Sequence, residues 1–125
     1  MRICVALAAL SFLCAGNAQA EPKVPLPTGT YRFRHMDAEF PRSPGFPVTV
    51  KIQGRRITVV NEHQHGVIPK GVLQVATLMW HAKSKQWILG HEEADQSAAE
   101  VGGCSAGPDT IDFSRRIIWT CEGGP

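Results

Sequence analysis

Apolar and polar residues alternate with a period of two along residues 48–59, which is the most regular pattern in the chain. Such alternation is typical of half-buried β-strands, and the Gly54-Arg55 step in its middle suits a type II′ turn. With that turn, Ile52 lies opposite Ile57, and the other apolar residues of the two arms also meet in pairs. A slip of one residue would destroy every pair. The pattern therefore predicts a β-hairpin with a fixed register.

A second hairpin is predicted over residues 72–90. If residues 82–85 form a four-residue loop, Trp80 lies opposite Trp87, and the neighbouring apolar residues pair as well. A cross-strand tryptophan pair adds about 0.5–1.5 kcal/mol beyond the burial of its rings. Because residues 72–80 are apolar on both faces, this segment is the candidate for a central strand.

The remaining segments complete an all-β plan. Alternation predicts a strand at residues 29–35, and residues 110–121 are expected to form a final strand or hairpin. The prolines of residues 21–28 exclude a helix or an inner strand, so these residues form an extended lead-in. Loops rich in proline and glycine are expected at residues 40–47 and 61–71.

Residues 91–103 carry the helical signal of this chain. Ser97 and Glu100 have the spacing of a capping box, and Gly102-Gly103 can end a helix, so one or two turns are expected at most. About six short strands with at most one short helix predict a small antiparallel meander. The meander closes as a barrel or as a sandwich, and the pattern does not separate the two.

Residues 1–20 have the organisation of an export signal. Arg2 precedes an apolar stretch, and an A-x-A cleavage site at residues 18–20 precedes Glu21. Cleavage there leaves the lead-in followed by a single β domain at residues 29–125. We therefore expect a periplasmic or secreted protein.

The cysteine content points to the same compartment. Cys4 and Cys14 are removed with the signal, which leaves Cys104 and Cys121. Two cysteines in an exported protein, not spaced as C-x-x-C, indicate one structural disulfide. A bridge across a loop of this length contributes about 3 kcal/mol to stability.

The charge balance narrows the range of partners. The chain has 13 basic and 11 acidic side chains, and Arg2 leaves with the signal. This near-neutrality argues against binding of nucleic acid or anionic lipid, both of which require a basic excess. After the signal, no apolar stretch reaches the ~18 residues of a membrane span. We expect a monomer without a cofactor.

Two histidines are the candidate metal ligands. His63 and His65 are spaced as H-x-H, which on an extended segment puts both imidazoles on one side, as Zn²⁺ or Cu²⁺ requires. No spacing supplies a third ligand, and two histidines in a polar loop are more often solvated. The sequence therefore predicts no bound metal, with His63 and His65 as the ligands if one does bind.

An acidic segment follows the second hairpin at Glu92, Glu93 and Asp95. Paired carboxylates can bind Ca²⁺ or act as acid and base, but the spacing is not that of an EF-hand, and a solvated surface is the simpler interpretation. Residues 103–107 match the G-x-S-x-G string of hydrolases. They lack the following helix and the later histidine that this elbow requires, so a disulfide-anchored loop is expected instead.

Two further groups have two interpretations each. The tryptophans and Tyr31 either line a pocket or fill the core, and the size of the domain favours the core. Two arginine pairs, Arg55-Arg56 and Arg115-Arg116, lie near predicted turns. They form a patch for an acidic partner only if both turns lie at the same end of the sheet; otherwise they are ordinary exposed charges.

The function that fits these observations is a non-enzymatic, inhibitor-like binding module for an extracytoplasmic protein or small ligand. In size, signal and disulfide number the chain resembles the periplasmic lysozyme inhibitors, which are small β-barrels, although it has none of their recognition motifs. The expected contact surface is made of loops at residues 36–47, 61–71 and 91–109. Its candidate residues are His63, His65, Glu92, Glu93 and Asp95. The alternatives are a structural component of the cell envelope, or a small enzyme or metal-binding protein that uses the His63/His65 loop.

Overall fold

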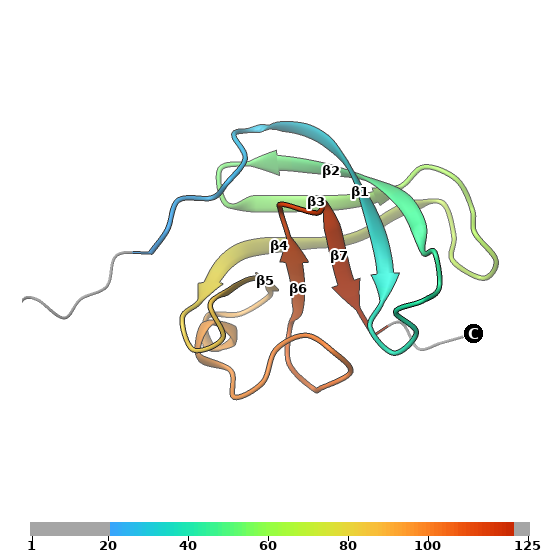
Figure 1. Cartoon of the computed structure of the whole chain (residues 1–125). Helices are drawn as coiled ribbons and strands as arrows, with labels where there is room; N and C mark the ends of the chain where they lie inside the picture. Colours follow the sequence, from blue (N-terminus) through green and yellow to red (C-terminus); the bar gives the residue numbers. More distant parts are fainter. Residues whose placement is uncertain (1–20, 122–125) are drawn as a thin grey trace, which may run out of the picture.

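The structure, a computed structural model that describes residues 21–121, contains seven strands and one short 3-10 helix (Figure 1). The elements are β1 (Gly29–Asp37), β2 (Phe46–Gln53), β3 (Arg56–Asn61), β4 (Gly71–His81), β5 (Gln86–Gly90), η2 (Glu93–Ser97), β6 (Asp109–Asp112) and β7 (Ile117–Thr120). Consecutive strands pair in antiparallel fashion, and β7 pairs in parallel with β1, so the sheet closes into a barrel. The predicted signal peptide, residues 1–20, lies outside the described residues.

The prediction of an all-β domain is confirmed, and the choice between barrel and sandwich is decided in favour of the barrel. Seven strands stand where about six were expected, because residues 110–121 form a hairpin, β6–β7, rather than a single strand. The barrel closes where Arg34 of β1 lies opposite Ile117 of β7. A closed barrel has no edge strand and leaves no unpaired ladder for another chain to extend.

Both predicted hairpins have the predicted register. Ile52 lies opposite Ile57 across the Gly54-Arg55 turn. Trp80 lies opposite Trp87, with ring centroids 5.5 Å apart and an edge-to-face geometry. In each case the pairing is local in sequence, so the apolar pattern and the turn residues are sufficient to fix it.

Strand β2 begins earlier than the sequence predicted. Residues 40–47 were expected to be loop, but Phe46 and Pro47 belong to β2, where Pro47 lies opposite Arg34 of β1. The β2–β3 pairing begins only at Thr49, so β2 is paired on one side at Pro47. Proline is tolerated there because its missing N–H is not required by a second neighbour.

The helical turn also lies elsewhere than the capping-box spacing predicted. It covers Glu93–Ser97, so Ser97 ends the helix instead of beginning it. Glu92 is the N-cap residue, and the carboxylate of Asp95 accepts the backbone N–H groups of His91 (2.7 Å) and Glu92 (3.2 Å). An aspartate aimed at two free N–H groups immediately after β5 stabilises this earlier start.

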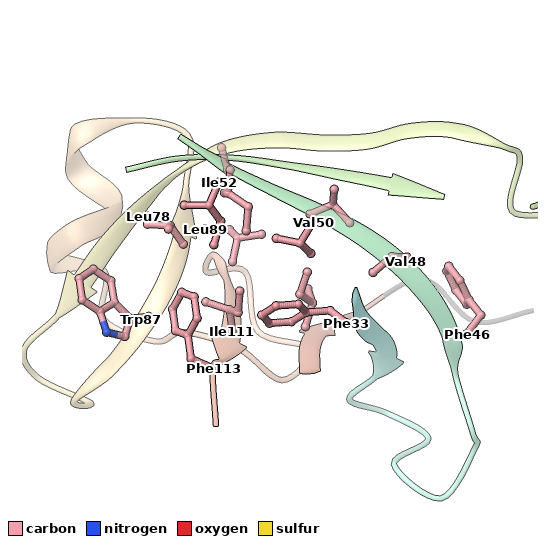
Figure 2. Packing of buried hydrophobic residues seen from close by; sticks show 14 residues of the cluster. Phe33, Phe46, Val48, Val50, Ile52, Leu78, Trp87, Leu89, Ile111 and Phe113 are labelled. Carbon is pink, nitrogen blue, oxygen red and sulfur yellow. The ribbon is translucent and has the colours of Figure 1, made fainter. Parts of the chain in front are cut away.

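The barrel interior is filled by side chains that alternate along the strands (Figure 2). The best buried are aliphatic, and Phe33, Trp87 and Phe113 form a chain of edge-to-face contacts across the interior. Of the aromatic residues expected in the core, Trp87 is buried, whereas Trp80, Trp119 and Tyr31 are only partly buried. The core interpretation is therefore confirmed for Trp87 and only partly for the others.

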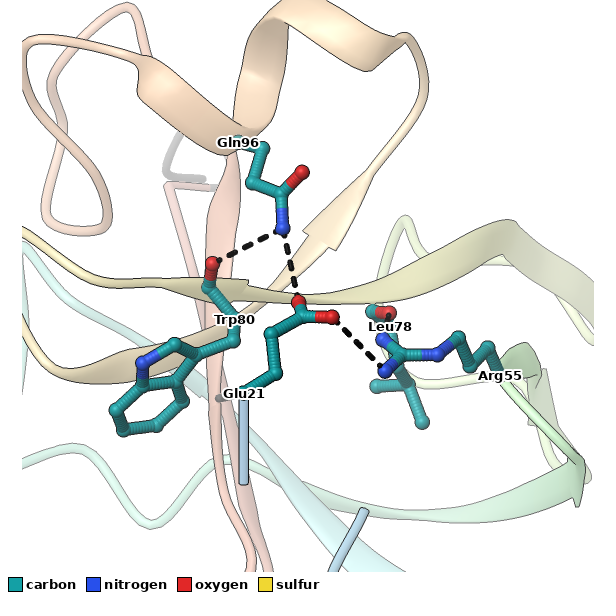
Figure 3. A network of polar contacts seen from close by, with 5 residues as sticks. All are labelled: Glu21, Arg55, Leu78, Trp80 and Gln96. Carbon is teal, nitrogen blue, oxygen red and sulfur yellow. Dashed lines mark hydrogen bonds and ion pairs between the residues drawn. The ribbon is translucent and has the colours of Figure 1, made fainter. Parts of the chain in front are cut away.

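The lead-in packs over one end of the barrel. Val24 and Leu26 contact the core, and the Oγ1 atom of Thr28 accepts the backbone N–H of Gly54 at 3.0 Å. Glu21 lies beside the same end, where its carboxylate accepts hydrogen bonds from Arg55 (3.2 Å) and from Gln96 (2.9 Å) (Figure 3). We call this the closed end; the turns β2–β3, β4–β5 and β6–β7 lie there.

The predicted disulfide is present. Cys104, in the β5–β6 loop, is bonded to Cys121, directly after β7, with 4.9 Å between their Cα atoms. The bridge fixes the longest loop of the described chain to the strand that closes the barrel. Among residues 21–121, no helix is long and apolar enough to cross a membrane.

Candidate functional site: a cleft at the open end of the barrel

The β1–β2 loop, the β3–β4 loop and the end of β7 meet at the other end of the barrel, which we call the open end. They enclose a cleft of about 1410 Å³. Most of its lining is apolar, and the apolar side chains include Phe40, Phe46, Val67, Ile68 and Leu73. Charged groups at the cleft are Asp37, Glu39 and Arg42.

A stack of three rings forms one wall of this cleft. The ring of Phe46 lies between those of His35 (centroids 4.8 Å apart, 29° between planes) and His65 (4.9 Å, 27°). The three residues come from β1, β2 and the β3–β4 loop, so the stack joins the barrel to the loop. Such stacking holds the rings in place, and it covers both faces of the Phe46 ring.

His35 is buried in this stack and carries no charge at neutral pH. Burial lowers its pKa from 6.5 to about 4, and the negative charge of Asp37 opposes that shift only in part. An uncharged imidazole keeps the wall of the cleft compatible with apolar ligands. The Nε2 atom of His65 is also buried and has no hydrogen-bond partner within the described chain.

Two apolar side chains at the cleft are exposed to solvent. Phe40 is 48% exposed and Val67 is 85% exposed. A folded domain gains nothing from leaving a phenylalanine ring in water, since burying a side chain of this size is worth about 1.5–3 kcal/mol. Exposed apolar groups beside an apolar cleft are typical of interaction sites.

The loop that carries Phe40 is held by its own hydrogen bonds. The backbone N–H of Glu39 donates to the Asp37 carboxylate (2.8 Å), and the Ser43 N–H donates to the Phe40 carbonyl (3.0 Å). Gly45 ends the loop with φ +64°, and a Cβ there would collide with the His35 carbonyl. The exposed ring is thus presented from a fixed frame.

The β3–β4 loop is equally anchored. His65 and Ile68 exchange two backbone hydrogen bonds, of 3.0 and 2.8 Å. These bonds close a small turn that contains Val67. Beneath it, the fully buried Asn61 donates from Nδ2 to the Pro69 carbonyl at 2.8 Å. Val67 therefore projects from the tip of a structured turn.

The structure separates the residues that the sequence proposed as a contact surface. His65 lines the cleft, while His63 is exposed on the same loop and is not part of the lining. Glu92, Glu93 and Asp95 belong to the η2 turn and do not line the cleft either. Phe40 and Val67 were not predicted as site residues from the sequence. The one feature that could have indicated them is that each is an apolar residue within a loop of prolines and glycines.

His63 and His65 have no third ligand in the described part of the chain. The one group of three potential ligand atoms found there is Glu39 with Cys104 and Cys121, and the two sulfur atoms are bonded to each other. A disulfide offers no thiolate to a metal ion.

A smaller cavity of about 450 Å³ lies beside the β4–β5 turn. Its wall includes His81, which is buried and whose ring nitrogens contact the Ser84 hydroxyl (2.7 Å) and the Ala98 carbonyl (2.8 Å). Since a carbonyl only accepts, Nε2 carries the proton and Nδ1 accepts from Ser84. This histidine ties the β5–β6 loop to the turn.

Comparison with known proteins identifies no relative: no family model, no curated protein and no solved structure matches this chain.

Proposed function

We propose that this protein is a non-enzymatic binding module of the periplasm or the secreted space, and that the cleft at the open end is its binding site. The observation that carries the proposal is the pairing of exposed apolar side chains, Phe40 and Val67, with an apolar cleft in a rigid frame. Binding at such a site gains from apolar burial and loses little entropy, because the loops are already ordered.

The expected occupant is an apolar, ring-bearing segment of a partner protein. The cleft exceeds the ~300–1,000 Å³ of pockets that take a single small molecule, and it is open to one side. The exposed ring of Phe40 at the cleft suits contact with a further aromatic ring. The loops that line the cleft belong to residues 36–47 and 61–71, which the sequence predicts as part of the contact surface.

The test uses residues 21–125, which contain the whole barrel, immobilised and exposed to extracytoplasmic extract of the source cells. Val67→Asp places a charge at the cleft, and Val75→Asp is the matched control. Val75 is also an exposed valine (42%), but it lies on β4 and does not line the cleft.

The proposal predicts a partner that the parent chain and Val75→Asp retain and that Val67→Asp releases while remaining folded by circular dichroism. Equal retention by all three chains would refute it. So would turnover of a hydrolase or isomerase substrate by the purified protein, because the enzyme alternative would then account for the activity.

A further inference from the structure

The disulfide between Cys104 and Cys121 forms part of the wall of the open-end cleft. Cys121 lines the cleft, and Cys104 lines the smaller cavity beside the β4–β5 turn. Both cysteines are exposed to solvent. Exposure lets the thiolate of a reductant approach the sulfur atoms, and exposed disulfides are more readily reduced than shielded ones. A reductant can therefore reach this bond, and the bond reaches the cleft.

The bridge braces the near end of the β1–β2 loop, which is one wall of the cleft. Cys121 directly follows Thr120, and the Thr120 carbonyl accepts the backbone N–H of Ala38 at 2.8 Å. The carboxylate of Glu39 lies 4.0 Å from the sulfur of Cys104. Since the loop begins at Ala38 and Glu39, the bridge is linked to its first two residues, one through each cysteine.

The far end of the same loop is anchored without the bridge. The guanidinium of Arg34 donates a hydrogen bond to the Pro44 carbonyl, and Phe46 begins β2 in its stack between two histidine rings. Opening the bridge therefore acts on the near end alone. A wall that is held at one end is less ordered before binding, and ordering it on binding costs affinity.

We infer that this disulfide is a redox switch of the cleft. The oxidised chain holds the β1–β2 loop in place for binding, whereas reduction of the bridge releases the near end of the loop and weakens binding. The inference rests on the proposed function, because it concerns the regulation of the same cleft.

The reductant of this switch is a dithiol, either a protein with a pair of thiols or a small molecule. One of its thiolates attacks the sulfur of Cys121 and displaces Cys104 as a thiolate, which leaves a mixed disulfide at Cys121. The second thiol of the reductant then displaces Cys121 in the same way. The reductant leaves as a disulfide, and each cysteine takes up a proton in place of the one that a reductant thiol gave up.

The first measurement follows the release of the loop and needs no ligand. Amide hydrogen exchange of residues 21–125 is recorded by NMR before and after reduction with dithiothreitol. The amide of Ala38, which donates to Thr120, should exchange at least about tenfold faster in the reduced chain. The control is the amide of His65, which donates to Ile68 in the other loop of the cleft and should change less than about twofold.

The double variant Cys104→Ser/Cys121→Ser separates the bridge from the reductant. It should show the fast exchange of Ala38 without dithiothreitol and no further change when dithiothreitol is added. Three results would overturn the inference: equal exchange of Ala38 in the two redox states, an equal rise at Ala38 and His65, or loss of the folded circular dichroism spectrum on reduction. In each of these cases the bridge would act only on overall stability or not at all.

The second measurement connects the switch to binding. The probe is the apolar fluorescent dye ANS, and only the part of its binding that Val67→Asp removes is counted as binding in the cleft. We expect this part to be at least about fivefold weaker in the reduced chain and to return on reoxidation. Val67-dependent binding that is equal in the two redox states would overturn the switch alone. If Val67→Asp removed no dye binding in either state, the proposed function would fail, and the switch with it.

Discussion

Truncation of the two paired tryptophans compares a buried core residue with a partly buried one. Trp87 is 6% exposed and also contacts Phe113, with ring centroids 6.2 Å apart. Removing a fully buried aromatic side chain costs about 3–5 kcal/mol, because both its burial and its volume are lost. We expect Trp87→Ala to lower the free energy of unfolding by an amount in this range.

Trp80 is the other ring of this pair, but it is only partly buried. Trp80→Ala should therefore cost about half as much, roughly 1.5–2.5 kcal/mol. The double variant should show a coupling of about 0.5–1.5 kcal/mol, which is the contribution of the ring pair itself.

The assay is urea unfolding followed by far-UV circular dichroism, because tryptophan fluorescence would change with the substitutions themselves. The midpoints of the two single variants are compared at a common m-value. If Trp80→Ala cost as much as Trp87→Ala, or more, the packing described for the β4–β5 hairpin would be wrong.

Three further outcomes are expected. Cys121→Ser lowers the free energy of unfolding by about 3 kcal/mol, and a thiol titration of the native protein finds no free sulfhydryl; two free thiols would contradict the bridge. Burial holds the pKa of His35 at about 4 in the folded chain, against 6.5 in the unfolded chain. As the pH falls, the unfolded chain therefore takes up a proton at this histidine before the folded chain does. Stability is therefore complete above pH 6.5 and falls by about 3 kcal/mol as the pH drops to 4; His35→Phe should flatten this slope in pH-dependent urea titrations. Zn²⁺ should leave the melting temperature unchanged, and a rise that His65→Ala abolishes would restore the metal site of His63 and His65.

The strand pairing within each hairpin could be predicted from the sequence, whereas the β1–β7 pairing that closes the barrel could not. Ile52 and Ile57 are five positions apart, so the alternation and the glycine of the turn determine their contact. By contrast, Arg34 and Ile117 meet across nearly the whole domain, and their parallel pairing depends on the accumulated twist of seven strands. No local pattern encodes that contact.

The same distinction explains what was missed at the site. His65 was selected for its chemistry, and it does line the cleft, but as a ring in a stack. Phe40 and Val67 were missed because a single apolar residue in a loop belongs to no periodic pattern. Whether such a residue is exposed is decided by the tertiary fold. The stack with Phe46 forms only because the start of β2 passes between β1 and the β3–β4 loop.

We propose above all that the open-end cleft binds a partner protein, and that binding buries the apolar surface of the cleft. The most direct measurement is isothermal titration calorimetry of the retained partner against the parent chain, Val67→Asp and Val75→Asp at several temperatures. Apolar burial predicts a negative heat-capacity change for the parent, at least about tenfold weaker binding for Val67→Asp, and unchanged affinity for Val75→Asp. Full affinity of Val67→Asp, or a heat-capacity change near zero, would contradict the assignment of the cleft.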